Sequence, residues 1–238
     1  MEPKQNLDLN PFLEEERIRK IQEKLFDYSR KFGGRFPEDD EAHARYLIKK
    51  YSVNTSVLMG VLEDQVVEKR IVEVGPGYAG RFMLDFLIEQ GADAISTDSR
   101  CNYEDYLGPS HGRYVFSGME KLSEAFDSED VDLINIMSMY PDPCPLEIKR
   151  AQEFGNLFQR IRANRYYKRY PSMLSDEINR VLKTTGYLLL WSRPYSDDFR
   201  LNPSCLNKKG FSHQTIKIPK NIMPVEFDVD IYQKQVAR

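Results

Sequence analysis

The chain has 238 residues, of which 41% are hydrophobic and 30% charged, and its formal net charge is −3. This apolar content suffices for a core and excludes a wholly disordered chain. A membrane helix needs about 20 apolar residues, and no run without charged residues is that long. The balanced charge gives the chain as a whole no electrostatic signature of a nucleic-acid-binding protein.

The three cysteines and three histidines lie far apart, so the sequence predicts neither a disulfide framework nor a metal site. The first residues lack the basic-then-apolar pattern of a secretory signal, which favours a cytoplasmic protein. We therefore expect no contact with a membrane. The sequence leaves the oligomeric state open.

A helical extension is predicted over residues 1–69. Apolar residues between Phe12 and Phe26 recur at helical spacing, and two glycines, Gly33 and Gly34, end that helix. Two further helices are predicted over residues 38–51 and 55–68.

A second domain is predicted over residues 70–238, where short apolar runs alternate with helical stretches. Helices are expected at 80–90 and 120–126, with two more between 146 and 183. The alternation indicates right-handed crossovers and a parallel sheet, and a final pair of runs suggests an antiparallel C-terminal edge strand. We predict an α/β fold with a seven-stranded, mostly parallel sheet, whose strands are at 70–74, 94–97, 113–116, 132–137, 187–191, 211–218 and 225–232.

The sharpest local signal is a glycine-rich turn, GPGYAG, that follows the first predicted strand at residues 75–80. Glycines permit a tight turn and close approach of a ligand, and the helix that follows presents unpaired N–H groups. Asp98 lies 21 residues after Gly77, where a carboxylate can accept hydrogen bonds from ribose hydroxyls. The spacing therefore indicates a nucleoside-containing ligand.

The same turn fits the pattern of NAD(P)-binding or flavin-binding oxidoreductases. Glu73, two residues before the first glycine, opposes that interpretation, because a negative charge is unfavourable near a pyrophosphate. It suits a ligand that carries an ammonium and a sulfonium.

The turn, Asp98 and the segment at residues 177–191 together resemble the class I S-adenosylmethionine-dependent methyltransferases, over about residues 70–192. The resemblance implies a Rossmann-like fold and S-adenosylmethionine as cofactor. Two departures exist: Thr184 and Thr185 replace the usual Pro-Gly, and no acid directly follows the third strand. The resemblance implies that the cofactor is bound by Glu73, Gly75, Gly77, Tyr78, Asp98, Ser99, Met119, Glu120 and Ser138. Of these, Met119 or Glu120 would contact the adenine.

A proline-rich loop after the fourth predicted strand carries the candidate catalytic residues. Asp142 is placed to orient or deprotonate an N–H or O–H acceptor, and Tyr140 to stack on a planar substrate or line the approach of the methyl group. The loop is similar to the Phe-Pro-Asp-Pro-Trp-Pro-Lys motif of the tRNA guanine-N7 methyltransferases. Cys144 follows a proline, as the nucleophile of cytosine-C5 methyltransferases does, although a lone thiol is more often a packing residue.

Residues 149–169 hold seven basic residues against one acid, and apolar residues recur there at helical spacing. We predict a helix with one apolar and one basic face, which is either a solvated surface or a site for a phosphate-bearing substrate. The sequence thus predicts methyl transfer to an O or N acceptor, with a small molecule favoured by the acidic net charge. The alternatives are an RNA methyltransferase that uses this basic segment, a noncatalytic cofactor-binding module and an NAD(P)-binding oxidoreductase.

Overall fold

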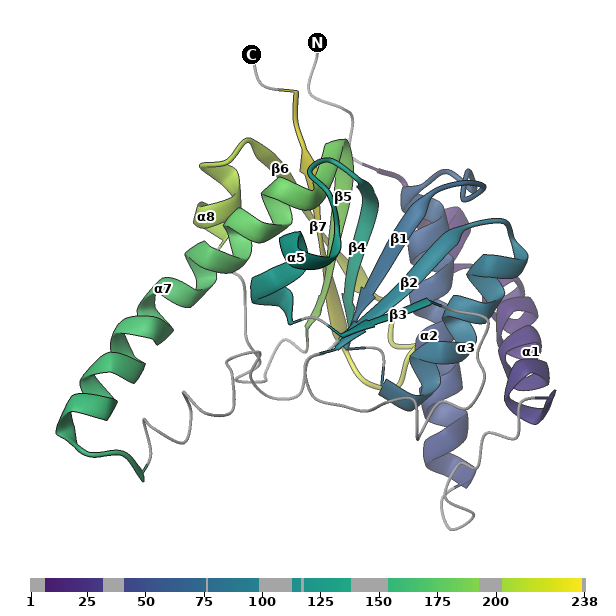
Figure 1. The fold of residues 1–238 in the computed structure, drawn as a ribbon. Coiled ribbons are helices and arrows are strands. Elements are labelled where there is room, and N and C mark those ends of the chain that lie inside the picture. The colour runs from purple at the N-terminus through teal and green to yellow at the C-terminus, as the bar shows by residue number, and fades with distance from the viewer. Residues whose placement is uncertain are drawn as a thin grey trace.

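The computed structural model describes residues 7–31, 41–75, 77–98, 113–116, 118–137, 154–192 and 203–236. Its centre is one seven-stranded sheet with the order β3-β2-β1-β4-β5-β7-β6 (Figure 1). The strands are β1 (Arg70–Val74), β2 (Asp93–Asp98), β3 (Arg113–Phe116), β4 (Val131–Met137), β5 (Leu182–Ser192), β6 (Phe211–Ile218) and β7 (Phe227–Lys234).

The first five strands run parallel, and β7 pairs antiparallel with both β5 and β6. The predicted α/β fold with a mostly parallel sheet and an antiparallel C-terminal strand is confirmed. The antiparallel strand is β7, which lies between β5 and the edge strand β6. The alternating residues Phe227, Val229 and Ile231 of β7 pack in one layer of the core, whereas Tyr232 packs in the other.

Helices cover both faces of the sheet (Figure 1). One face carries η1 (Asn10–Leu13), α1 (Glu15–Lys31), α2 (Glu41–Val61) and α3 (Gly77–Glu89), and the other carries η2 (Met119–Lys121), α5 (Leu122–Ala125), α7 (Leu157–Val181) and α8 (Pro203–Asn207). Side chains from α1 and α2 form one continuous apolar cluster with the sheet and α3. Within the described ranges, no helix is both long enough and apolar enough to cross a bilayer.

The prediction of two helices over 38–51 and 55–68 is wrong, because α2 runs unbroken from Glu41 to Val61. The polar residues between the two predicted helices and just after them are satisfied inside the protein. The hydroxyls of Ser52 and Thr55 each donate to a carbonyl four residues earlier in α2, both at 2.7 Å. Asn54 bonds to a side chain of the sheet instead, so burial of α2 outweighs its weak helix propensity.

Of the two helical segments predicted between residues 146 and 183, the described residues form one, α7. Its start is fixed by a capping box in which Asn156 and Gln159 satisfy each other's backbone N–H groups. The N-terminal halves of α2 and α7 extend past the carboxyl ends of the parallel strands (Figure 1). That is the edge at which open α/β sheets bind their ligands.

Candidate cofactor site and active site

The glycine turn lies at the carboxyl end of β1, as predicted. Gly75 has a φ of 65°, a left-handed conformation that favours glycine. Its N–H donates to the carbonyl oxygen of Thr97 in the neighbouring strand β2, at 2.8 Å. The helix α3 begins at Gly77, so the turn presents the backbone donors of a helix start beside β1 and β2.

Glu73 is fully buried at the end of β1, with none of its surface exposed. Its Oε2 accepts a hydrogen bond from Nδ2 of Asn135 in β4, whereas its Oε1 has no hydrogen-bond partner among the described residues. Burial raises the pKa of Glu73 to about 8, although the hydrogen bond from Asn135 and the positive charge of Lys50 act in the opposite direction. A buried carboxyl with an unsatisfied oxygen is costly unless a further donor approaches it.

Asn135 is in turn held by Asn54 of α2. The two side-chain amides bond reciprocally: Asn54 Nδ2 lies 3.2 Å from Asn135 Oδ1, and Asn135 Nδ2 lies 3.0 Å from Asn54 Oδ1. Both side chains are fully buried. The helix α2 is therefore connected to Glu73 by hydrogen bonds through Asn135.

Asn54, Asn135 and Lys50 are site residues that the sequence did not predict. The available signal was the asparagine in the otherwise apolar run that ends β4, because parallel strands place Asn135 directly beside Glu73. A polar residue at such a position needs a polar partner. No pattern in the sequence shows which residues of α2 face that pair.

Several other predicted cofactor residues lie along the same edge of the sheet. Asp98 is the last residue of β2, and Tyr78 is in the first turn of α3. Met119 and Glu120 form the short helix η2, where the Met119 side chain is buried in the core. The remaining predicted residues, Ser99, Ser138, Tyr140 and Asp142, lie outside the described residues, as does Cys144.

A second buried polar atom lies near this edge. The indole Nε1 of Trp191, close to the carboxyl end of β5, has no hydrogen-bond partner among the described residues. Trp191 pairs with Met137 of β4 in the sheet register and packs in the α2 layer of the core. The carboxyl edge thus holds unsatisfied buried groups on β1 and β5.

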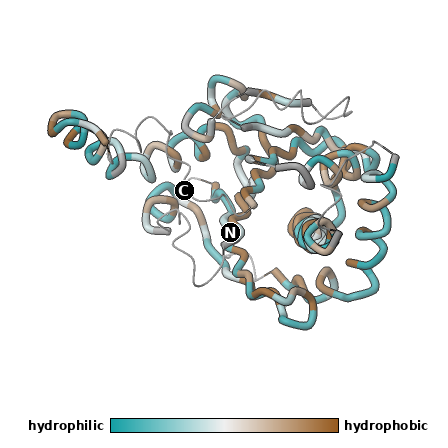
Figure 2. Tube along the Cα trace, turned by 90° about the horizontal axis from the view of Figure 1, so that it is seen from below, coloured by the Kyte–Doolittle hydropathy of each residue, from teal (hydrophilic) through white to brown (hydrophobic). Residues whose placement is uncertain are grey.

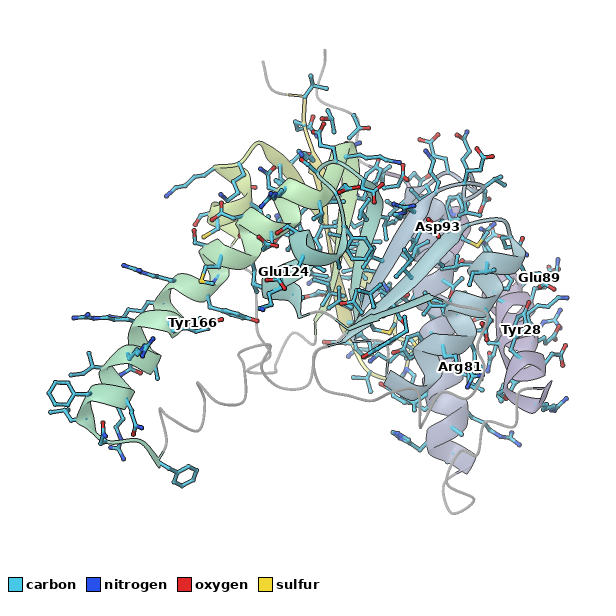
Figure 3. The ribbon with its side chains drawn as sticks, viewed as in Figure 1. Tyr28, Arg81, Glu89, Asp93, Glu124 and Tyr166 are labelled. Atoms are coloured by element: carbon cyan, nitrogen blue, oxygen red, sulfur yellow. The ribbon has the colours of Figure 1, made fainter. Side chains whose placement is uncertain are left out.

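The predicted division of the basic helix into an apolar and a basic face is wrong for the described part of α7. Phe154, Leu157, Phe158 and Ile161 are as solvent-exposed as the arginines that follow them. The helix is instead anchored by residues further along, including Tyr170 and Leu174. Tyr166, labelled in Figure 3, marks where α7 meets the core, since it packs partly against the same cluster.

No protein-family model matches this chain, and neither does any curated protein sequence. Solved structures do match. A SAM-dependent methyltransferase from Archaeoglobus fulgidus superposes with a TM-score of 0.51 at 14% identity, over 88% of this chain and 99% of that protein. A TehB-like SAM-dependent methyltransferase from Corynebacterium glutamicum matches with a TM-score of 0.48 at 16% identity, over 74% and 85%. At 14% identity the similarity to the Archaeoglobus fulgidus structure establishes the fold alone, and the chain has the Rossmann-like fold of that SAM-dependent methyltransferase.

Proposed function

We propose that this protein is an enzyme that binds S-adenosylmethionine at the carboxyl edge of β1 and β2 and transfers its methyl group to an N or O acceptor. The single observation that carries the proposal is Glu73, a buried carboxyl with one oxygen left without a donor beside a glycine turn. An ammonium group supplies both the missing donor and a compensating charge. A pyrophosphate would supply neither, which favours this cofactor over NAD(P).

In this proposal the turn residues Gly75, Gly77 and Tyr78 surround the methionine part of the cofactor beside Glu73. Asp98 and Ser99 hold the ribose, Met119 and Glu120 border the adenine, and Ser138 closes the site from the end of β4. When bound, the cofactor supplies an electrophilic methyl group on a sulfonium. Asp142 accepts the acceptor's proton as the bond from the acceptor to the methyl carbon forms and the carbon–sulfur bond breaks, which leaves S-adenosylhomocysteine, and Tyr140 positions the acceptor.

Cofactor binding is tested by calorimetric titration of the protein with S-adenosylhomocysteine. We expect micromolar binding that Gly75→Ala weakens at least tenfold, because a side chain is strained at its positive φ and crowds the turn. Gly91→Ala is the matched control: Gly91 also has a positive φ, of 90°, but lies at the amino end of β2, and an added Cβ there makes only ordinary contact with Val67. That variant is expected to keep its affinity.

Binding of NAD(P) without any binding of S-adenosylhomocysteine would contradict the proposal. Catalysis is tested with methyl-labelled cofactor and fractionated cell extract, with RNA and metabolites counted separately. Asp142→Ala is expected to abolish transfer and to leave the affinity for S-adenosylhomocysteine unchanged. Cofactor binding without transfer to any fraction would indicate the noncatalytic module instead.

The acidic net charge, which favoured a small-molecule acceptor, is a property of the whole chain and does not describe the surface beside the site. The described part of α7 concentrates exposed basic residues on the edge of the molecule where the acceptor must arrive. This observation favours RNA as the acceptor over an acidic or neutral metabolite.

A further inference from the structure

Residues 154–169, which comprise the N-terminal part of α7 and the three residues that precede it, project from the body of the protein past the carboxyl ends of the strands, and we call this segment the α7 arm (Figures 1 and 2). It carries large apolar side chains that are unusually exposed: 83% for Phe154, 71% for Leu157, 83% for Phe158 and 42% for Ile161. Other large hydrophobic residues of the described chain are mostly buried in the two core clusters. A concentrated exposed apolar group of this kind indicates an interaction site.

The exposed apolar and basic residues share one side of the helix. Residues three or four apart lie on the same face of a helix. This spacing joins six residues, which we call the arm face: Phe158, Ile161, Arg162, Arg165, Lys168 and Arg169. All six are exposed. Ala163 and Tyr170, seven residues apart on the opposite side, are buried, so the arm face points to solvent.

The arm face also carries charge without counter-charge. From Phe154 to Ser175 the sequence has five basic residues and no acid. Within the described residues, no ion pair neutralises Arg162, Arg165, Lys168 or Arg169. Several cations elsewhere are paired, as in the i,i+4 pairs of α1 that join Arg19 to Glu23 and Lys20 to Glu16.

We propose that the arm face binds single-stranded RNA and holds it beside the carboxyl edge of the sheet. The inference rests on the proposed function and names its substrate class. Single strands are bound by cations that follow the phosphates and by aromatic rings on which bases stack, and folded RNAs present such strands in their loops. The arm face offers four unpaired cations together with Phe158, and a fully exposed second ring, Phe154, lies at its tip.

Two other occupants fit the arm less well. A helix that lies in a membrane surface separates its apolar face from its basic face, whereas here both kinds of side chain share one face. A second copy of the chain would bring two acid-free arms together, and like charges that face each other across an interface are repulsive. Charge complementarity therefore favours a polyanion with exposed bases.

The proposal is tested by fluorescence anisotropy of a labelled single-stranded RNA of random sequence, titrated with the full-length protein at several salt concentrations. Replacing Arg162, Arg165, Lys168 and Arg169 together by Gln should weaken binding at least tenfold and lower the slope of log affinity against log salt by about 3. Phe158→Ala should weaken binding about tenfold with little change in the slope. The matched control, Arg19→Gln with Lys20→Gln on α1, removes two exposed cations and should bind as the unaltered protein does.

Each variant is also titrated with S-adenosylhomocysteine, whose affinity should not change. The proposal is overturned if the unaltered protein does not bind the RNA, or if the arm variants bind it as well as the control does. Binding to anionic phosphatidylserine vesicles in place of RNA, or loss of a dimer in the arm variants without loss of RNA binding, would equally overturn it. If RNA binds but S-adenosylhomocysteine does not, the proposed function fails while the arm proposal stands.

Discussion

Glu73 faces one neutral donor, Asn135, and one nearby cation, Lys50, yet its burial dominates and holds its pKa near 8. A carboxyl group in this state is largely protonated at neutral pH and can ionise when a cation arrives. If the cofactor's ammonium binds there, binding releases a proton below about pH 8, and affinity rises as the pH approaches that value.

The free protein should lose stability as the pH rises from about 4.5 to about 8, the ordinary and the folded pKa of Glu73. Across this window the folded state keeps a proton that the unfolded chain has released, so rising pH favours unfolding. Glu73→Gln removes this contribution. The difference in unfolding free energy between the variant and the unaltered protein should therefore shift in favour of the variant as the pH increases. Chemical denaturation at several pH values measures the difference.

Glu226→Gln is the control for that series, because Glu226 forms an exposed pair with Lys220 and should shift stability little at any pH. Parallel stability curves for Glu73→Gln and the unaltered protein would contradict the assignment of a protonated Glu73.

At the scale of elements, the sequence predicted best where one local pattern decides the outcome. The predicted bounds of β1, β3 and β6 match the structure, with short apolar runs at β1 and β3, and the glycine turn follows β1 as predicted. The sequence did not predict the continuity of α2, because Asn54 finds its partner Asn135 only after α2 packs against the sheet. The exposure of Phe158 was missed for the same reason, since periodicity does not show which face of a helix has a neighbour.

Gly60 of α2 illustrates how packing reverses a propensity rule. Alanine is normally better than glycine inside a helix by about 1 kcal/mol. A Cβ at Gly60 would lie 2.5 Å from Cγ of Phe12 in η1, which is too close. Gly60→Ala should therefore destabilise the protein by about 1–3 kcal/mol, as measured by chemical denaturation. Combining it with Phe12→Ala should restore the ordinary preference, and an unaltered or raised stability of the single variant would show that η1 does not pack there.

At the scale of the whole molecule, the two ends of β1 differ in how their polar groups are paired. At the amino edge, Arg70 bonds to Asp93 and Asp130. Asp132 accepts from Lys183 at 2.7 Å and from the N–H of Arg70 at 2.9 Å. The carboxyl edge holds the unsatisfied oxygen of Glu73 instead. The ion pairs at the amino edge therefore connect the strands, whereas Glu73 at the carboxyl edge is available to a ligand.

Asp132 connects β1, β4 and β5 at the amino edge, so protonation of its carboxylate in acid should destabilise the protein. Burial opposes its ionisation, but the hydrogen bonds from Lys183 and from the backbone of Arg70 outweigh that effect and keep the pKa of Asp132 below its ordinary value of 3.8. Its contribution is present above that value and disappears as the pH falls through the folded pKa. Asp132→Asn should lower stability by about 1–3 kcal/mol at neutral pH, with a smaller deficit in acid.

Denaturation curves between neutral and acid pH provide the measurement. Asp127→Asn, at an exposed position nearby, should leave stability unchanged. A deficit for Asp132→Asn that stays constant into strong acid would show that its charge is not what stabilises the edge.

The order of the strands also constrains how the sheet can be completed. β6 leaves the ribosome before β7, yet its only neighbour among the described strands is β7, which also fills the gap beside β5. Until β7 is synthesised, β6 has no ladder to join and the flank of β5 stays open to pairing with other chains. The end of the sheet beyond β5 can therefore be completed only after β7 has been made, since β7 is the strand that connects β6 to the rest of the sheet.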